Sequence, residues 1–203
     1  MKIMDRMIDL TGNWLAELGP DNGLSEPVTW LKRRGGYAFV NRLVGSAIPF
    51  APRNRFAVEE VRTGYVRARI AIKGNKNHFG SLYAGAYFVV AEIPGGVLTL
   101  FDLGPAYVPI LKEMTLAFLK PSDTDVIVEM SLTTEELTRI REESDATGRA
   151  AFTLTGELRD ETGEIVARST AHYRVKKKGF TGVELGQFQA GVIDSSVSRN
   201  ACP

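Results

Sequence analysis

A carboxylate, Glu92, lies inside the apolar run YAGAYFVVAEIPGG, residues 83 to 96. An unpaired buried charge is costly, so such an acid either has partners or performs chemistry. A helix that starts near Ala84 places Gly85, Phe88 and Glu92 on one stripe. Glycine lets a ligand approach the amide hydrogens of a helix N-terminus, which carry partial positive charge. Acyl transfer needs these two elements, with Glu92 as general base or nucleophile and the Gly85 amide as oxyanion donor.

The same residues also allow structural roles. Glu92 could pair with an arginine across an interface or accept backbone hydrogen bonds, and Gly85 could permit close helix–strand packing. Pro94 follows Glu92 by two residues and removes one helical hydrogen bond, so we expect a kink or an early helix end there. By their chemistry, Asn77 and Ser81 are typical of turns and caps, although they could also shape a ligand pocket.

Composition excludes several classes of function. The chain has 203 residues, a hydrophobic fraction of 44% and a net charge of +1. These values are typical of one globular domain and give no electrostatic case for binding nucleic acid or an anionic membrane. Cys202 is the single cysteine, and the two histidines, His78 and His172, show no metal-ligand spacing. We therefore expect no disulfide, no metal and no cofactor.

The sequence also lacks targeting signals. No apolar run approaches the roughly 20 residues of a membrane span, and the first residues, MKIMDRMIDLTGNW, lack a signal-peptide core. We expect a cytoplasmic protein that does not associate with membranes.

Hydrophobic periodicity predicts the elements that position these residues. Residues 1 to about 50 are expected to be helical, and because Gly35 and Gly36 weaken the middle, two short helices are an alternative to one. Period-two alternation then predicts strands before the central helix and four more strands after it. A charged segment, TEELTRIREESDATG, predicts a short exposed helix in which Glu135 and Arg139 are suitably spaced to pair.

This order predicts an α+β fold in which one antiparallel sheet wraps around the central helix. We divide the chain into a helical extension (1–54), a main domain (55–178) and a C-terminal tail (179–203). The basic segment RVKKK, residues 174 to 178, is either a solvated strand end or a contact for ligand phosphates.

From Asn77 to Glu92 the chain resembles hotdog thioesterases of the phenylacetyl-CoA type, whose pattern is N-x-x-G-x-x-H-G-G-x-x-x-x-L-A-D. Glu92 stands at the acid position without a gap, while Tyr83 replaces the histidine and Ala84 the first glycine. The later FLKPSDTDV resembles the F-L-x-P segment of the same family. The opening stretch is still more similar to a hotdog subgroup catalogued as a domain of unknown function, in which the acid is often glutamate.

The resemblance implies a hotdog fold, acyl-CoA-like thioester ligands, and a homodimer or a dimer of dimers. It also implies that the acid of one subunit works with the helix N-terminus of the other. Three functions follow: a thioester hydrolase, a non-catalytic acyl-thioester-binding protein, or a structural or regulatory assembly module. Beside the catalytic pair Glu92 and Gly85, the candidate substrate-binding residues are Asn77, His78, Gly80, Ser81, Tyr83 and Ala84.

Overall fold

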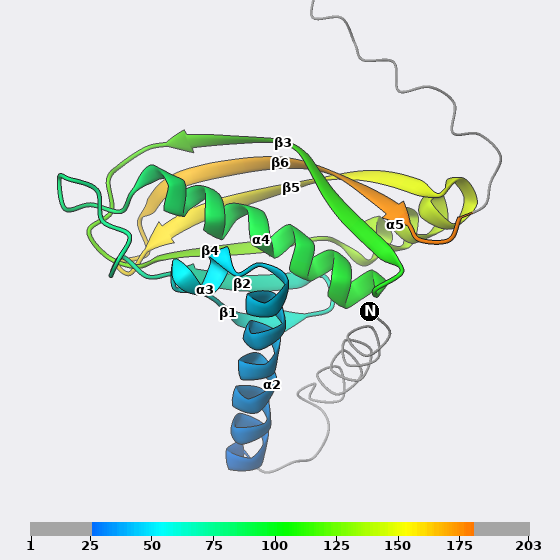
Figure 1. Ribbon diagram of the computed structural model, residues 1–203, viewed down its shortest axis with the longest axis horizontal. Coiled ribbons are helices and arrows are strands. Elements are labelled where there is room, and N and C mark those ends of the chain that lie inside the picture. The colour runs from blue at the N-terminus through cyan, green and yellow to red at the C-terminus, as the bar shows by residue number, and fades with distance from the viewer. Residues whose placement is uncertain (1–25, 181–203) are drawn as a thin grey trace, which may run out of the picture.

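The computed structural model describes residues 26–180, with side chains described from residue 35 onward (Figure 1). The N-terminal part of the predicted extension and nearly all of the predicted C-terminal tail lie outside these residues. The described elements are, in chain order, α2 (Glu26–Ala47), α3 (Phe50–Arg53), β1 (Phe56–Arg62), β2 (Tyr65–Ile70), α4 (Ala84–Leu103), β3 (Tyr107–Phe118), β4 (Val126–Ser131), α5 (Thr134–Thr147), β5 (Arg149–Asp160) and β6 (Ile165–Lys177).

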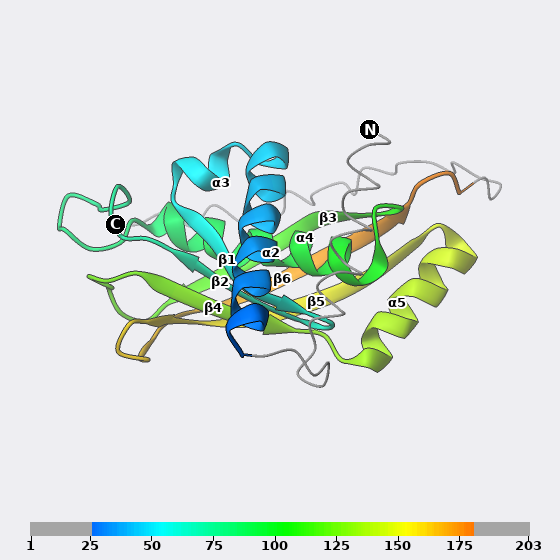
Figure 2. The same cartoon turned by 90° about the horizontal axis from the view of Figure 1, so that it is seen from below.

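The strands form a six-stranded sheet in the order β1-β2-β4-β5-β6-β3, and every neighbouring pair is antiparallel. The sheet curls around α4, which runs along its inner face (Figure 1). The loop before α4 lies at one end of the domain and α5 at the other, as both views show (Figure 2). The predicted fold, an antiparallel sheet wrapped around one helix, is therefore confirmed.

Alternation of apolar and polar residues determines which face of each strand is buried. In β2, Val66, Ala68 and Ile70 are fully buried toward α4, whereas Arg67 and Arg69 point outward and are partly exposed. Gly64 lies in the turn between β1 and β2, with a φ of 68° that a side chain would disfavour. Because successive strand residues face opposite sides, this period-two pattern identified the core correctly.

Helix α4 continues through Pro94 to Leu103, so of the two alternatives that we expected, a kink or an early end, the early end is wrong. Proline removes one backbone hydrogen bond, but burial of Val90, Ala91 and Leu98 by the sheet stabilises the helix on both sides of it. By length and composition α4 could span a membrane, contrary to our expectation. However, 56% of its most apolar window is buried inside the domain, which is typical of a core helix.

Helix α2 runs without a break through both glycines, so the two short helices that we considered are one. Tertiary contacts hold the part of this helix that follows the two glycines. The side-chain oxygen of Asn41 accepts a hydrogen bond from the Val58 amide (2.7 Å), and its amide group donates to the Val58 carbonyl (2.8 Å). Asn41 thereby occupies backbone groups on β1, the edge strand of the sheet, and holds α2 against it.

Helix α5 begins at a capping box, in which Thr133 and Glu136 exchange side-chain and backbone hydrogen bonds. The expectation of an exposed helix is only half right, because Leu137 and Ile140 are buried against the sheet. Arg139 pairs with Glu143 (3.0 Å), one turn onward, and not with Glu135 as its spacing suggested.

Candidate active site

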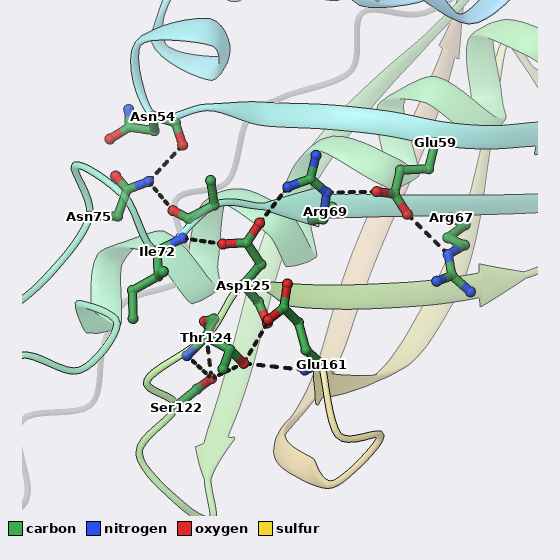
Figure 3. A network of polar contacts seen from close by, with 11 residues as sticks. Asn54, Glu59, Arg67, Arg69, Ile72, Asn75, Ser122, Thr124, Asp125 and Glu161 are labelled. Carbon is green, nitrogen blue, oxygen red and sulfur yellow. Dashed lines mark hydrogen bonds and ion pairs between the residues drawn. The ribbon is translucent and has the colours of Figure 1, made fainter. Parts of the chain in front are cut away.

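The loop before α4 is fixed to the domain by Asn75, which is buried. Its side-chain amide donates to the carbonyls of Asn54 and Ala71, at 2.7 Å each (Figure 3). Its own carbonyl accepts a hydrogen bond from the amide of Tyr83 (2.8 Å), the residue that caps α4. One buried residue therefore anchors the loop through its side chain and holds the start of the helix through its backbone carbonyl.

Asp125 ties the same loop to the outer face of the sheet (Figure 3). One carboxylate oxygen accepts from the Ile72 amide (2.9 Å), and the other pairs with Arg69. Arg69 and Arg67 in turn share Glu59, at 2.6 and 3.1 Å. Because the charges alternate along this network, it holds β1, β2, β4 and the loop together without leaving a buried charge unpaired.

The predicted substrate-binding residues of this loop mainly build the loop itself. The Asn77 side-chain oxygen accepts from the amides of Phe79 (2.9 Å) and Ser81 (3.2 Å). Gly80 has a φ of 93°, which the tight turn requires. The Ser81 hydroxyl donates to Asp123 (2.7 Å). The turn roles expected for Asn77 and Ser81 are therefore present, and the Asn77 side-chain oxygen and the Ser81 hydroxyl already have partners within the protein.

His78 lies at the exposed tip of the loop, with its ring 3.8 Å from that of Phe79. Phe79 is 81% exposed, so neither ring is part of the core. His78 is thus a loop residue in the described subunit, and the structure does not bring it to the stripe of α4 that carries Glu92.

The N-terminus of α4 is open to an anion because no side chain among the described residues caps it. Tyr83 occupies the N-cap position, and the exposed Ala84 and the half-buried Gly85 follow in the first turn. The Tyr83 ring lies directly over Gly85, where a Cβ atom would come within 2.6 Å of it. A side chain at position 85 would therefore have to displace the Tyr83 ring, which is 60% exposed.

Glu92 lies seven residues later, on the stripe of α4 that the sheet leaves partly uncovered, together with Phe88 and Gly96. Burial raises the pKa of its carboxyl group above the ordinary value of 4.5. None of the described residues forms an ion pair or a side-chain hydrogen bond with this carboxylate. Among the side chains that the structure describes, Glu92 therefore has no arginine partner of the kind that a structural role would provide.

Sequence reasoning missed Tyr173, which holds the Glu92 turn in place. Its hydroxyl donates to the backbone carbonyl of Glu92 (2.6 Å), and its ring stacks on Phe152 with centroids 5.1 Å apart. Burial, and secondarily the charge of Glu92, raise the pKa of Tyr173, so it remains a donor near neutral pH. Gly95 makes room for this ring, because a Cβ there would lie 2.3 Å from it. The signal that could have suggested this contact is a tyrosine at an inward-facing strand position, Tyr173, together with the glycine pair Gly95 and Gly96 on the buried helix.

Metal chemistry has no evident support in the described part of the chain, where no three histidine, cysteine, aspartate or glutamate side chains form a metal-binding group. The site offers one carboxylate and the free amides of one helix N-terminus. Acid–base or nucleophilic chemistry on a carbonyl group is what these two elements can support.

An antiparallel sheet wrapped around one long helix, with an acid on the uncovered stripe of that helix, defines a hotdog protein of the thioesterase-like superfamily. Residues 36–175 match the family described as Domain of unknown function (DUF4442), and the chain belongs to that family. None of the curated proteins matches this chain.

Solved structures agree with this assignment. PA5026 from Pseudomonas aeruginosa, a protein of unknown function described as a probable thioesterase, is 40% identical. That match covers 69% of this chain and 95% of the other, with a TM-score of 0.64. The thioesterase HI1161 from Haemophilus influenzae is 13% identical over 70% of this chain and 90% of that one, with a TM-score of 0.56. The protein OLEI01261 from Chlorobaculum tepidum, of unknown function, is also 13% identical over 70% and 94%, with a TM-score of 0.62. The latter two likenesses concern the fold alone.

Proposed function

We propose that this protein hydrolyses acyl-CoA or a related acyl thioester. The observation that carries the proposal is Glu92, a half-buried carboxylate with a raised pKa and no ionic partner in the described subunit. A carboxylate whose pKa lies closer to neutrality is a better general base. The 40% identity to a protein described as a probable thioesterase supports the same reaction class.

In the reaction, Glu92 acts in one of two ways. As a general base it takes a proton from water while the water oxygen attacks the thioester carbonyl. As a nucleophile it attacks the carbonyl carbon itself, forming an anhydride that water then hydrolyses. In either route the carbonyl oxygen becomes an oxyanion, the carbon–sulfur bond breaks, and the departing thiolate takes up a proton. The first-turn amides of an α4 helix, including that of Gly85, stabilise the oxyanion.

Glu92 and Gly85 of the same helix cannot both contact one carbonyl group. They are seven residues apart, which is about 10 Å along the axis at about 1.5 Å per residue. A complete site therefore requires Glu92 of one subunit and the α4 N-terminus of another. For this reason we propose that the active protein is a homodimer, alone or paired into a dimer of dimers.

Strand β3 is the element through which we expect the dimer to form. It lies at the edge of the sheet, is 12 residues long and pairs only with β6 in the described chain. Phe88 and Phe118 are 40% and 49% exposed beside this edge, with ring centroids 6.4 Å apart. A long unpaired edge with exposed aromatic groups is an unfavourable surface for a monomer, and a second copy would cover it.

The activity is tested by measuring thiol release from short, long and aromatic acyl-CoA substrates, in parallel with light scattering. We expect hydrolysis of at least one substrate and a particle of two or four times the chain mass of 22.3 kDa. A monomer at micromolar concentration would contradict the shared site. If the protein neither hydrolyses any thioester nor binds one saturably, only an assembly role remains. We also propose the cytoplasm as the location of the protein.

The second candidate is a non-catalytic acyl-thioester-binding protein. Tyr83 favours it, because a tyrosine stands at the histidine position of the catalytic pattern and its ring covers Gly85. Binding without turnover in the same substrate series would establish this alternative.

A further inference from the structure

A cavity of about 310 Å³ lies between α2, the C-terminal half of α4 and the start of β3. Its walls are apolar: α2 supplies Val40 and Val44, and α4 supplies Ile93 and Leu100. Among the described residues that line it, Lys178 is the only charged one. A cavity with this lining favours an aliphatic ligand over a polar one.

The cavity adjoins the proposed catalytic carboxylate. Gly96 belongs to its lining and lies on the same stripe as Glu92, one turn onward or about 6 Å along the axis. A Cβ atom built on Gly96 would meet nothing within 4 Å, so the space in front of this residue is open. An acyl group whose carbonyl carbon reaches Glu92 could therefore extend its chain directly into the cavity.

The size of the cavity limits the chain. The α4 lining runs from Ile93 to Phe101, eight residues or about 12 Å along the axis. At about 30 Å³ for each water-sized group, the cavity would hold about ten such groups. This elongated space fits a straight chain better than a compact polar group.

We propose that this cavity binds the aliphatic chain of the acyl thioester and that α2 sets the longest chain accepted. The inference rests on the proposed hydrolase function, because it assigns the acyl end of that substrate. It gives the helical extension a role in specificity, since without α2 one wall of the cavity would be missing.

The test compares octanoyl-CoA with acetyl-CoA as substrates of Gly96→Leu and of Gly35→Leu. Both glycines lie in helices and both have room for a Cβ atom, but Gly35 does not line the cavity. Each buried methylene strengthens binding roughly fourfold, so a leucine that displaces several methylenes should lower the octanoyl-to-acetyl ratio of kcat/KM at least tenfold. Gly35→Leu should leave this ratio unchanged. Val44→Phe, which fills the cavity from α2, should lower it as Gly96→Leu does.

An unchanged ratio in both cavity variants, with hydrolysis intact, overturns the cavity assignment while leaving the hydrolase proposal standing. If the wild-type protein hydrolyses neither substrate, calorimetric titration with octanoyl-CoA and acetyl-CoA replaces the rate. Tighter binding of octanoyl-CoA that Gly96→Leu abolishes keeps the cavity assignment and rejects the hydrolase. Binding that does not depend on chain length, or no binding, overturns the cavity assignment.

Discussion

Two adjacent glycines in α4 should respond to alanine with opposite changes in stability. A Cβ on Gly95 would lie 2.3 Å from Cζ and 2.4 Å from the hydroxyl oxygen of Tyr173, whereas a Cβ on Gly96 would meet nothing within 4 Å. Tyr173 cannot move aside easily, because it is 3% exposed and its ring stacks on Phe152. The helix or the ring must therefore shift in Gly95→Ala.

The expected free-energy changes follow from this geometry. Overpacking of a core costs about 1–3 kcal/mol, and loss of the Tyr173 hydrogen bond to Glu92 would add about 1 kcal/mol. Replacing a helical glycine by alanine returns about 0.5–1 kcal/mol through backbone entropy. Gly95→Ala should thus destabilise the protein by about 1–3 kcal/mol, while Gly96→Ala should stabilise it by about 0.5–1 kcal/mol.

Urea unfolding monitored by circular dichroism measures both variants under the same conditions. The midpoint should fall for Gly95→Ala and rise for Gly96→Ala, with similar slopes. If both variants shift the midpoint in the same direction, then the packing of Tyr173 against α4 is not as described here.

Three further predictions concern single residues. Burial raises the pKa of Asp102 from 3.8 to about 6, so the folded state disfavours the ionised carboxylate. The resulting loss of folding stability is absent below the ordinary pKa and complete above pH 6. Asp102→Asn can still accept a hydrogen bond from the Gly64 amide and should stabilise the protein by about 1–2 kcal/mol at about pH 7. This value takes about 1.4 kcal/mol for each pH unit by which the pKa is raised and reduces the sum because the group is partly exposed. Urea titrations should show that the gain vanishes near pH 4, and a gain that does not depend on pH would refute the prediction. Tyr173→Phe should cost about 1 kcal/mol and lower kcat more than it raises KM, because Glu92 loses its support; equal kinetics would show that Tyr173 is only structural. Thr133→Ala removes the α5 cap and should lower thermal stability by about 1 kcal/mol, with no change in thioester hydrolysis.

Local patterns predicted the elements whose structure depends on neighbouring residues. The alternation around Val126 and Val128 identified β4, and the all-round apolar run identified α4 as the buried helix. Asn77 was correctly assigned to a turn, because its hydrogen bonds reach only to Phe79 and Ser81. Such features need no knowledge of distant parts of the chain.

Long-range contacts account for what the sequence could not show. Asn41 fastens the C-terminal half of α2 to β1 across 17 positions. Tyr173 reaches the Glu92 carbonyl from 81 positions away. Strand β3 begins at Tyr107, well before the alternation of Met114, Leu116 and Phe118 that the sequence shows. Its first residues belong to the strand because they pair with β6, beginning with Tyr107 and Lys177. The cavity beside Gly96 likewise depends on three elements that meet only in the folded domain.

The turnover of Glu92→Gln, measured with the best thioester substrate, tests the central claim most directly. Glutamine keeps the size of the side chain but cannot act as a base, so kcat should fall at least about a hundredfold with little change in stability. Glu142→Gln, on the exposed face of α5, is the matched control and should retain normal turnover. Because burial raises the pKa of Glu92, the wild-type rate should rise with pH through a midpoint above 4.5, and this limb should be absent from the variant. Normal turnover by Glu92→Gln would show that the carboxylate does not take part in the reaction.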